Sequence, residues 1–127
     1  MSPNPLPAPE PPSLRVAEWE AGRVIVLALS GALVQATAHV LEQPLVRALA
    51  RRVPPLVVVD ADRLSAVDAA GGDLLAHAVR YAAQAGGRLL VAGGGEHVVA
   101  HVADALAPTL DAALSELARP TRHSDPS

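Results

Sequence analysis

The chain has 127 residues, half of them hydrophobic, which is enough for one domain with a substantial core. Phenylalanine and cysteine are absent and there is one tryptophan, so the core must be built from leucine, valine and alanine. The absence of cysteine excludes disulfides, thiolate nucleophiles and zinc sites built on sulfur. A net charge of −3 without a basic run argues against a nucleic-acid partner.

The basic side chains are all arginine, and the missing lysine excludes Walker-type phosphate loops, Schiff-base chemistry and the phospho-receiver domains. No stretch has the pattern of a signal peptide or the length of a membrane-spanning segment. We therefore expect a soluble, cytoplasmic protein without direct membrane insertion.

Residues 1–13 contain six prolines, which favour extended conformations and prevent a helix. This segment is predicted to be a disordered Pro-rich tail, and the polar residues 119–127 a second disordered tail. One ordered domain is expected over residues 14–118.

The first elements of that domain are predicted to be a β-hairpin and a helix. Strands Leu14–Glu20 and Arg23–Ser30 flank a turn at Ala21-Gly22, and Gly31 is expected to end the second strand. A helix begins near Thr37, which is placed to cap it, and Pro44 should kink it. Its apolar face comprises Ala38, Leu41, Leu45 and Leu49.

The centre of the chain has the pattern of a strand, a loop and a helix. Leu56–Asp60 is predicted to be a buried strand, and apolar residues recur at helical spacing over Asp73–Ala85. The loop residues Asp68–Gly72 precede this helix, where backbone N–H groups are unpaired and point outward. Small residues at this place allow another molecule to approach closely.

The last third is predicted to add one strand and two helices. Gly86-Gly87 would cap the preceding helix, Arg88–Ala92 forms a strand, and Gly93–Gly95 turns the chain into a helix over residues 96–106. A final helix begins at Pro108 or Thr109 and runs to Ala118. Strands that alternate with helices predict an α/β sandwich with a partly parallel sheet.

Three pieces of sequence, in this order and spacing, carry a family resemblance. They are Ser30-Gly31-Ala32-Leu33 with Thr37-Ala38, then Val57–Asp60 with Val67–Gly71, and finally Gly86–Val91. The chain resembles the STAS domain, a fold shared by bacterial anti-sigma factor antagonists and the cytoplasmic ends of sulfate transporters. The resemblance implies an α/β, STAS-like sandwich of a four- to five-stranded mixed sheet and about four helices. Only a few residues separate Leu106 from the final helix, so the last strand of the family is expected to be shortened or missing here.

One position departs from the antagonists that the chain resembles. Their loop before the second helix usually reads Asp-Ser-Ser-Gly, and a partner kinase that is also the anti-sigma factor phosphorylates the second serine. Ala70 is the equivalent position here, Ala69 precedes it, and neither has a hydroxyl group. Val34 stands where the family often has aspartate. The resemblance therefore implies a non-catalytic domain that binds an anti-sigma factor/serine kinase without being phosphorylated at this position.

The resemblance also implies a contact surface made of the loop before the second helix, the start of that helix and the loop after the second strand. The predicted partner-binding residues are Leu33, Val34, Gln35, Thr37, Asp68, Ala69, Ala70, Gly71, Gly72 and Leu75. Two alternatives stay open: a STAS subunit of a lipid-transport ABC complex that binds its ATPase, and a domain that senses a small ligand such as a nucleotide or lipid. The partner's identity and the oligomeric state are not determined.

Other polar clusters are interpreted as structural, so no catalytic residue, metal or cofactor is predicted. Four aspartates near the central loop suit magnesium, but they also suit a strand end, loop hydrogen bonds and a first helical turn. His97 and His101 are four residues apart, yet Val98 stands where a metalloprotease helix needs glutamate. Gly93–Gly95 matches no nucleotide-binding fingerprint and is interpreted as a flexible connection. The four aspartates are Asp60, Asp62, Asp68 and Asp73.

Overall fold

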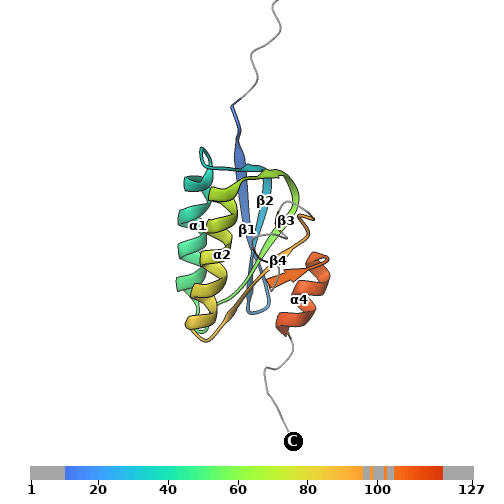
Figure 1. Ribbon diagram of the computed structural model, residues 1–127. Helices are drawn as coiled ribbons and strands as arrows, with labels where there is room; N and C mark the ends of the chain where they lie inside the picture. Colours follow the sequence, from blue (N-terminus) through green and yellow to red (C-terminus); the bar gives the residue numbers. More distant parts are fainter. Residues whose placement is uncertain (1–10, 96–97, 99–101, 103–104, 119–127) are drawn as a thin grey trace, which may run out of the picture.

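The computed structural model describes residues 11–95, 98, 102 and 105–118, and these form a five-stranded mixed sheet with helices on both faces (Figure 1). The described elements are β1 (Leu14–Ala21), β2 (Val24–Leu33), α1 (Ala38–Arg51), β3 (Leu56–Val67), α2 (Ala69–Gln84), β4 (Arg88–Ala92), β5 (Leu106–Ala107) and α4 (Leu110–Ala118). The α/β class and the mixed sheet predicted from the sequence are confirmed. None of the described helices is long and apolar enough to cross a membrane.

The strands lie in the sheet in the order in which they occur in the chain. β1 and β2 form the predicted antiparallel hairpin, and its turn lies at Gly22-Arg23, one residue later than expected. β2, β3, β4 and β5 are parallel to one another. The carboxyl ends of β2 and β3 therefore meet at one end of the sheet, the upper end in Figure 1, where α1 and α2 begin.

The core has two layers, one on each face of the sheet. Val57 and Val59 of β3 pack beneath α1 and α2 against Leu41 and Leu75. Val58, between them in sequence, points to the other face and packs with Leu117 of α4. Because both faces of β3 are covered here, its first residues are uniformly aliphatic rather than alternating with polar ones.

The strands β2 and β3 are longer than predicted. β3 continues past Asp60 to Val67, and β2 continues past Gly31 to Leu33, because the two strands keep pairing through Gly31–Leu64 and Leu33–Val67. Irregularities in the register accompany this extension. The polar residues of β3, which the sequence analysis assigned to a loop, lie at exposed positions between the buried Ala61 and Leu64.

Asp68–Gly72 was also predicted to be a loop, and this is wrong, because α2 begins at Ala69 with Asp68 as its N-cap. α1 begins after Thr37 as expected and runs through Pro44 to Arg51. At the other end of α2, Gly86 has a φ of 83° and the N–H of Gly87 donates to the carbonyl of Ala82, as predicted for a glycine cap.

The last strand is present but has two residues, in agreement with the shortened strand expected from the short spacing between Leu106 and the final helix. Leu106 belongs to this strand, so the preceding helix cannot extend to it as predicted. Of the helix predicted over residues 96–106, Val98 and Val102 are described, and both are helical and buried. Its histidines, His97 and His101, lie outside the described residues, as do segments 1–10 and 119–127. The final helix is confirmed, and the Thr109 hydroxyl accepts from the N–H of Ala112 at its start.

Candidate partner-binding site

The carboxylate of Asp68 joins two segments that are far apart in the sequence. Its Oδ1 accepts a hydrogen bond of 2.9 Å from the N–H of Gly71 in the first turn of α2. Its Oδ2 accepts one of 2.9 Å from the N–H of Gln35 in the loop between β2 and α1. The Asp68 N–H in turn donates to the carbonyl of Leu33. One side chain therefore fixes the start of α2 against the β2–α1 loop.

These hydrogen bonds lower the pKa of Asp68 below its ordinary value of 3.8, with the Gly71 N–H contributing most and the Gln35 N–H next. Both donors stabilise the ionised carboxylate, and the positive end of the α2 dipole has the same sign of effect. Asp68 is therefore an anion at neutral pH, and it is already paired with backbone donors.

Thr37 holds the same loop from inside. Its side chain is 4% exposed, and its hydroxyl donates to the carbonyl of Ala32 at 2.6 Å and accepts from the N–H of Val34 at 3.0 Å. The predicted role is corrected here, because Thr37 is the N-cap residue of α1 but its side chain makes no capping hydrogen bond to the helix. It instead satisfies backbone groups of the loop, which would otherwise be buried without partners.

Gly71 brings α2 close to the end of β2. A Cβ atom at this position would overlap the carbonyl oxygen and side chain of Leu33. Gly71 and Gly72 are both buried, so they are not the open small-residue loop that the sequence analysis expected. Their small size serves the packing of helix against strand rather than the approach of another molecule.

The structure brings the ten predicted residues together but gives them two different roles. Five are buried and support the surface residues from the interior: Leu33, Thr37, Gly71, Gly72 and Leu75. Five reach the surface at this end of the sheet: Val34, Gln35, Asp68, Ala69 and Ala70. We call these last five the α2 N-terminal surface. It carries one carboxylate and the methyl groups of two alanines.

The sequence analysis missed an apolar groove between α1 and α2. It has a volume of about 290 Å³ and is lined by Leu45, Val46, Leu49, Leu74 and Tyr81, among others. Val46 is 64% and Tyr81 51% exposed. Both lie outside the apolar stripes of their helices, which is the signal that could have identified them as surface residues.

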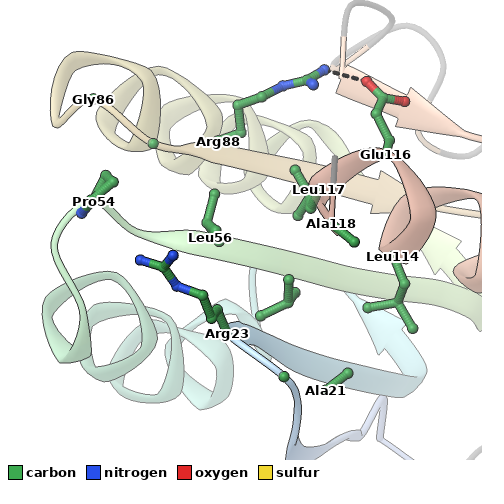
Figure 2. Close-up of a pocket in the computed structure, with 13 residues that line it drawn as sticks. Ala21, Arg23, Pro54, Leu56, Gly86, Arg88, Leu114, Glu116, Leu117 and Ala118 are labelled. Carbon is green, nitrogen blue, oxygen red and sulfur yellow. Dashed lines mark hydrogen bonds and ion pairs between the residues drawn. The ribbon is translucent and has the colours of Figure 1, made fainter. Parts of the chain in front are cut away.

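A second cavity lies at the opposite end of the sheet, where β2, β3 and β4 begin (Figure 2). Its volume is about 550 Å³, and Pro54, Leu56 and Leu114 are among the apolar residues that line it. Arg88 and Glu116 form an ion pair of 2.5 Å across its rim. Four separate segments meet here, and no local sequence pattern predicts such a meeting.

The four aspartates do not form one cluster. Asp60 lies within β3 rather than at its end, and its Oδ1 accepts from the N–H of Asp62. Asp68 makes the predicted hydrogen bonds to backbone N–H groups, and Asp73 is exposed in the first turns of α2. Within the described part of the chain, no three His, Cys, Asp or Glu side chains are placed to hold a metal ion.

Comparison with known families gives a single assignment for this arrangement. A family model described as "Mlab, STAS domain" matches residues 16–107, which is most of the chain. The chain belongs to the STAS domain family. Among curated protein sequences none matches it.

Solved structures of other proteins share this fold. The crystal structure of an anti-sigma factor antagonist from Mycobacterium paratuberculosis has a TM-score of 0.73 and 25% identity, with 90% of this chain and 100% of the other covered. A Thermotoga maritima protein assigned to the same class has a TM-score of 0.68 at 13% identity, covering 82% and 95%. The murine anion transporter Slc26a9 has a TM-score of 0.61 at 14% identity, covering 75% of this chain and 18% of the transporter.

Proposed function

We propose that this STAS domain is a non-catalytic protein-binding domain that resembles the anti-sigma factor antagonists and acts in the cytoplasm. Its partner would be an anti-sigma factor/serine kinase that contacts the α2 N-terminal surface. The similarity to the mycobacterial antagonist, which extends over the whole of that protein, supports this class of partner.

The observation that carries the proposal is the side chain at position 70. Ala70 lies in the first turn of α2, next to the capping Asp68, and is partly accessible. It is the position at which the antagonists resembled by this chain carry the phosphorylated serine. A phosphate there would place two negative charges at a surface that already holds an aspartate, and would repel an acidic or apolar partner. A methyl group cannot accept that phosphate, so we propose that binding is constitutive.

The other hydroxyl groups near this surface do not replace the missing serine. Thr37 is buried and engaged with the backbone. Ser65 carries the one hydroxyl between Asp60 and Gly72, and it lies on β3, where it donates to the carbonyl of Gly31. Phosphate at stoichiometric levels on any residue from 60 to 72 that disappears in Ser65→Ala would contradict phosphorylation-independent binding. Mass spectrometry of the protein from its own cells measures this.

The central test is affinity isolation from the protein's own cell lysate, followed by binding measurements with the purified partner. Ala70→Asp introduces a charge without a partner into the α2 N-terminal surface, and we expect it to weaken binding at least tenfold, about 1.4 kcal/mol. Ala83→Asp is the matched control, because Ala83 is an exposed alanine at the far end of the same helix. Equal affinity of both variants for the partner would remove this surface from the interface.

The same experiment tests a second class of partner, because a surface without a phosphoacceptor also suits a purely structural subunit. The matching family model takes its description from the STAS domain Mlab and not from an antagonist. Recovery of an ABC transporter ATPase, lost in Ala70→Asp, would assign the domain to a lipid-transport ABC complex. Recovery of neither protein class, with thermal stabilisation by a nucleotide or lipid, would support a small-ligand sensor.

A further inference from the structure

Three polar side chains form a row across the first three strands of the sheet. Arg15 of β1 is paired with Ser30 of β2, and Ser30 is paired with Arg63 of β3. Neighbouring strands are about 4.8 Å apart, so the two arginines start roughly 10 Å from each other with the serine midway. Paired residues of adjacent strands point to the same face, and long arginine side chains on both sides can therefore reach an ion above the serine.

This row lies on the face of the sheet opposite to α1 and α2. Leu14 and Val16, on either side of Arg15, pack into the core beneath these helices, so Arg15 points the other way. α4 packs against this second face, but its contacts are with β2, β3, β4 and β5, and in Figure 1 it lies beside β4. A cavity of about 510 Å³ lies over this row, and the residues that line it include Arg15, Ala17, Ala28, Ser30, Asp60 and Arg63.

Among the described residues, Arg15 and Arg63 have no acidic partner within ion-pair distance, which is also true of Arg23, Arg47 and Arg80. Arg51, Arg52 and Arg88 each form an ion pair with a glutamate, whereas no ion pair is found for Arg15 or Arg63. Asp60 lines the same cavity one row away, opposite Ala28, and it is not within ion-pair distance of either arginine. Its Oδ1 accepts from the N–H of Asp62 instead.

We propose that Arg15, Ser30 and Arg63 bind the phosphate group of a small phosphate monoester. Two guanidinium groups balance the two charges of such a phosphate, and each presents planar N–H donors that match pairs of phosphate oxygens. The Ser30 hydroxyl supplies a further donor between them. The alanine side chains of the adjoining row, Ala17 and Ala28, leave space for the organic part of the ligand. This site is on the opposite face of the sheet from α2, so it is independent of the partner surface proposed above.

The protein contains its own probe for this site. Trp19 is the single tryptophan, is 42% exposed and lies on β1 four residues from Arg15, which places it on the same face. Titration of the full chain with phenyl phosphate should change the Trp19 fluorescence saturably. Benzoate, which offers the same ring with a single charge, should bind at least tenfold more weakly. Inorganic phosphate that binds as tightly as phenyl phosphate would overturn the assignment to an ester.

Substitutions test which residues bind the phosphate group. Arg15→Gln and Arg63→Gln should each weaken phenyl phosphate binding at least tenfold, and Ser30→Ala about threefold. Asp60→Asn should strengthen it, because a nearby negative charge is removed. Arg47→Gln is the matched control, since Arg47 is an exposed arginine on α1. Thermal unfolding checks that each variant is folded. No saturable binding to the wild-type chain, or an equal loss in Arg47→Gln, would overturn the proposal.

Discussion

Different interactions hold the segments together at the carboxyl end and at the amino end of the parallel strands. At the carboxyl end, Asp68 and Thr37 hold the β2–α1 loop and the start of α2 through hydrogen bonds to named backbone groups. At the amino end, Pro54, Leu56 and Leu114 surround a cavity, and an exposed ion pair crosses its rim (Figure 2). Hydrogen bonds are directional and fix one loop geometry, whereas apolar contacts tolerate small rearrangements.

This difference supports the proposal that the carboxyl end contacts the partner. The groups that a partner would contact, such as Gln35 and Ala70, belong to segments that are already held in place in the free protein. A preorganised surface does not have to lose loop entropy on binding, so more of its contact energy appears as affinity. The amino end also has backbone hydrogen bonds, such as the one from the Arg88 N–H to the Pro55 carbonyl, but among the described residues no side chain there ties two loop segments together through their backbone groups as Asp68 does.

The largest expected effect concerns a glycine at each end. A Cβ at Gly71 would overlap the Leu33 carbonyl, and a Cβ at Gly87 would overlap the Pro55 carbonyl. Gly71→Ala and Gly87→Ala should each lower the free energy of unfolding by about 3 kcal/mol or more, because backbone atoms must move. Urea denaturation measures this. The reverse exchange, Ala83→Gly at an exposed helix position, should lower the free energy of unfolding by about 1 kcal/mol. Similar losses in all three variants would contradict the close backbone contacts described for the two glycines.

The next effect isolates the buried hydroxyl group of the carboxyl end. Thr37→Val keeps the shape of the side chain but leaves the Ala32 carbonyl and the Val34 N–H without their partner. The free energy of unfolding should fall by about 1–3 kcal/mol. Thr109→Val removes a hydroxyl from an exposed helix start and should cost about 1 kcal/mol. A smaller loss for Thr37→Val than for Thr109→Val in denaturation experiments would contradict the role given to Thr37.

The Asp68 hydrogen bonds make the carboxyl end sensitive to pH. The pKa of Asp68 is lower in the folded state than its ordinary value of 3.8, so the ionised carboxylate stabilises the fold above that value. This stabilisation is lost as the pH falls through the folded-state pKa. Asp68→Asn cannot accept both hydrogen bonds, so its melting temperature should lie below that of the wild type at neutral pH. The difference should shrink below pH 3.8, and a constant difference down to the acid transition would contradict this assignment.

The smallest effect is expected at the amino end. Arg88 and Glu116 are 45% and 41% exposed, so water and salt screen their attraction. A double-mutant cycle with Arg88→Gln and Glu116→Gln should give a coupling energy below about 1 kcal/mol, and the coupling should decrease in high salt. A coupling of several kcal/mol would mean that this ion pair, rather than apolar contact, closes the amino end.

The local pattern of the sequence was sufficient for the elements that bury one clear face. β4 was predicted at its observed bounds, because an aliphatic run between two glycine-containing turns allows few alternatives. The ends of β2, β3 and α2 were predicted less well. Residues 61–67 carry charged and hydroxyl side chains, and only pairing with β2 makes them a strand.

The sequence by itself determined the fold class through its periodicity and the STAS resemblance through short motifs. That resemblance implied the ten residues around the start of α2, and their role in partner binding stays a prediction. Tertiary structure decided which of the ten are accessible. Gly71 and Thr37 are buried because α2 and the β2–α1 loop pack against each other, a contact between residues more than thirty positions apart. It also decided the row of Arg15, Ser30 and Arg63, since the register of three strands, not any local pattern, places these side chains together.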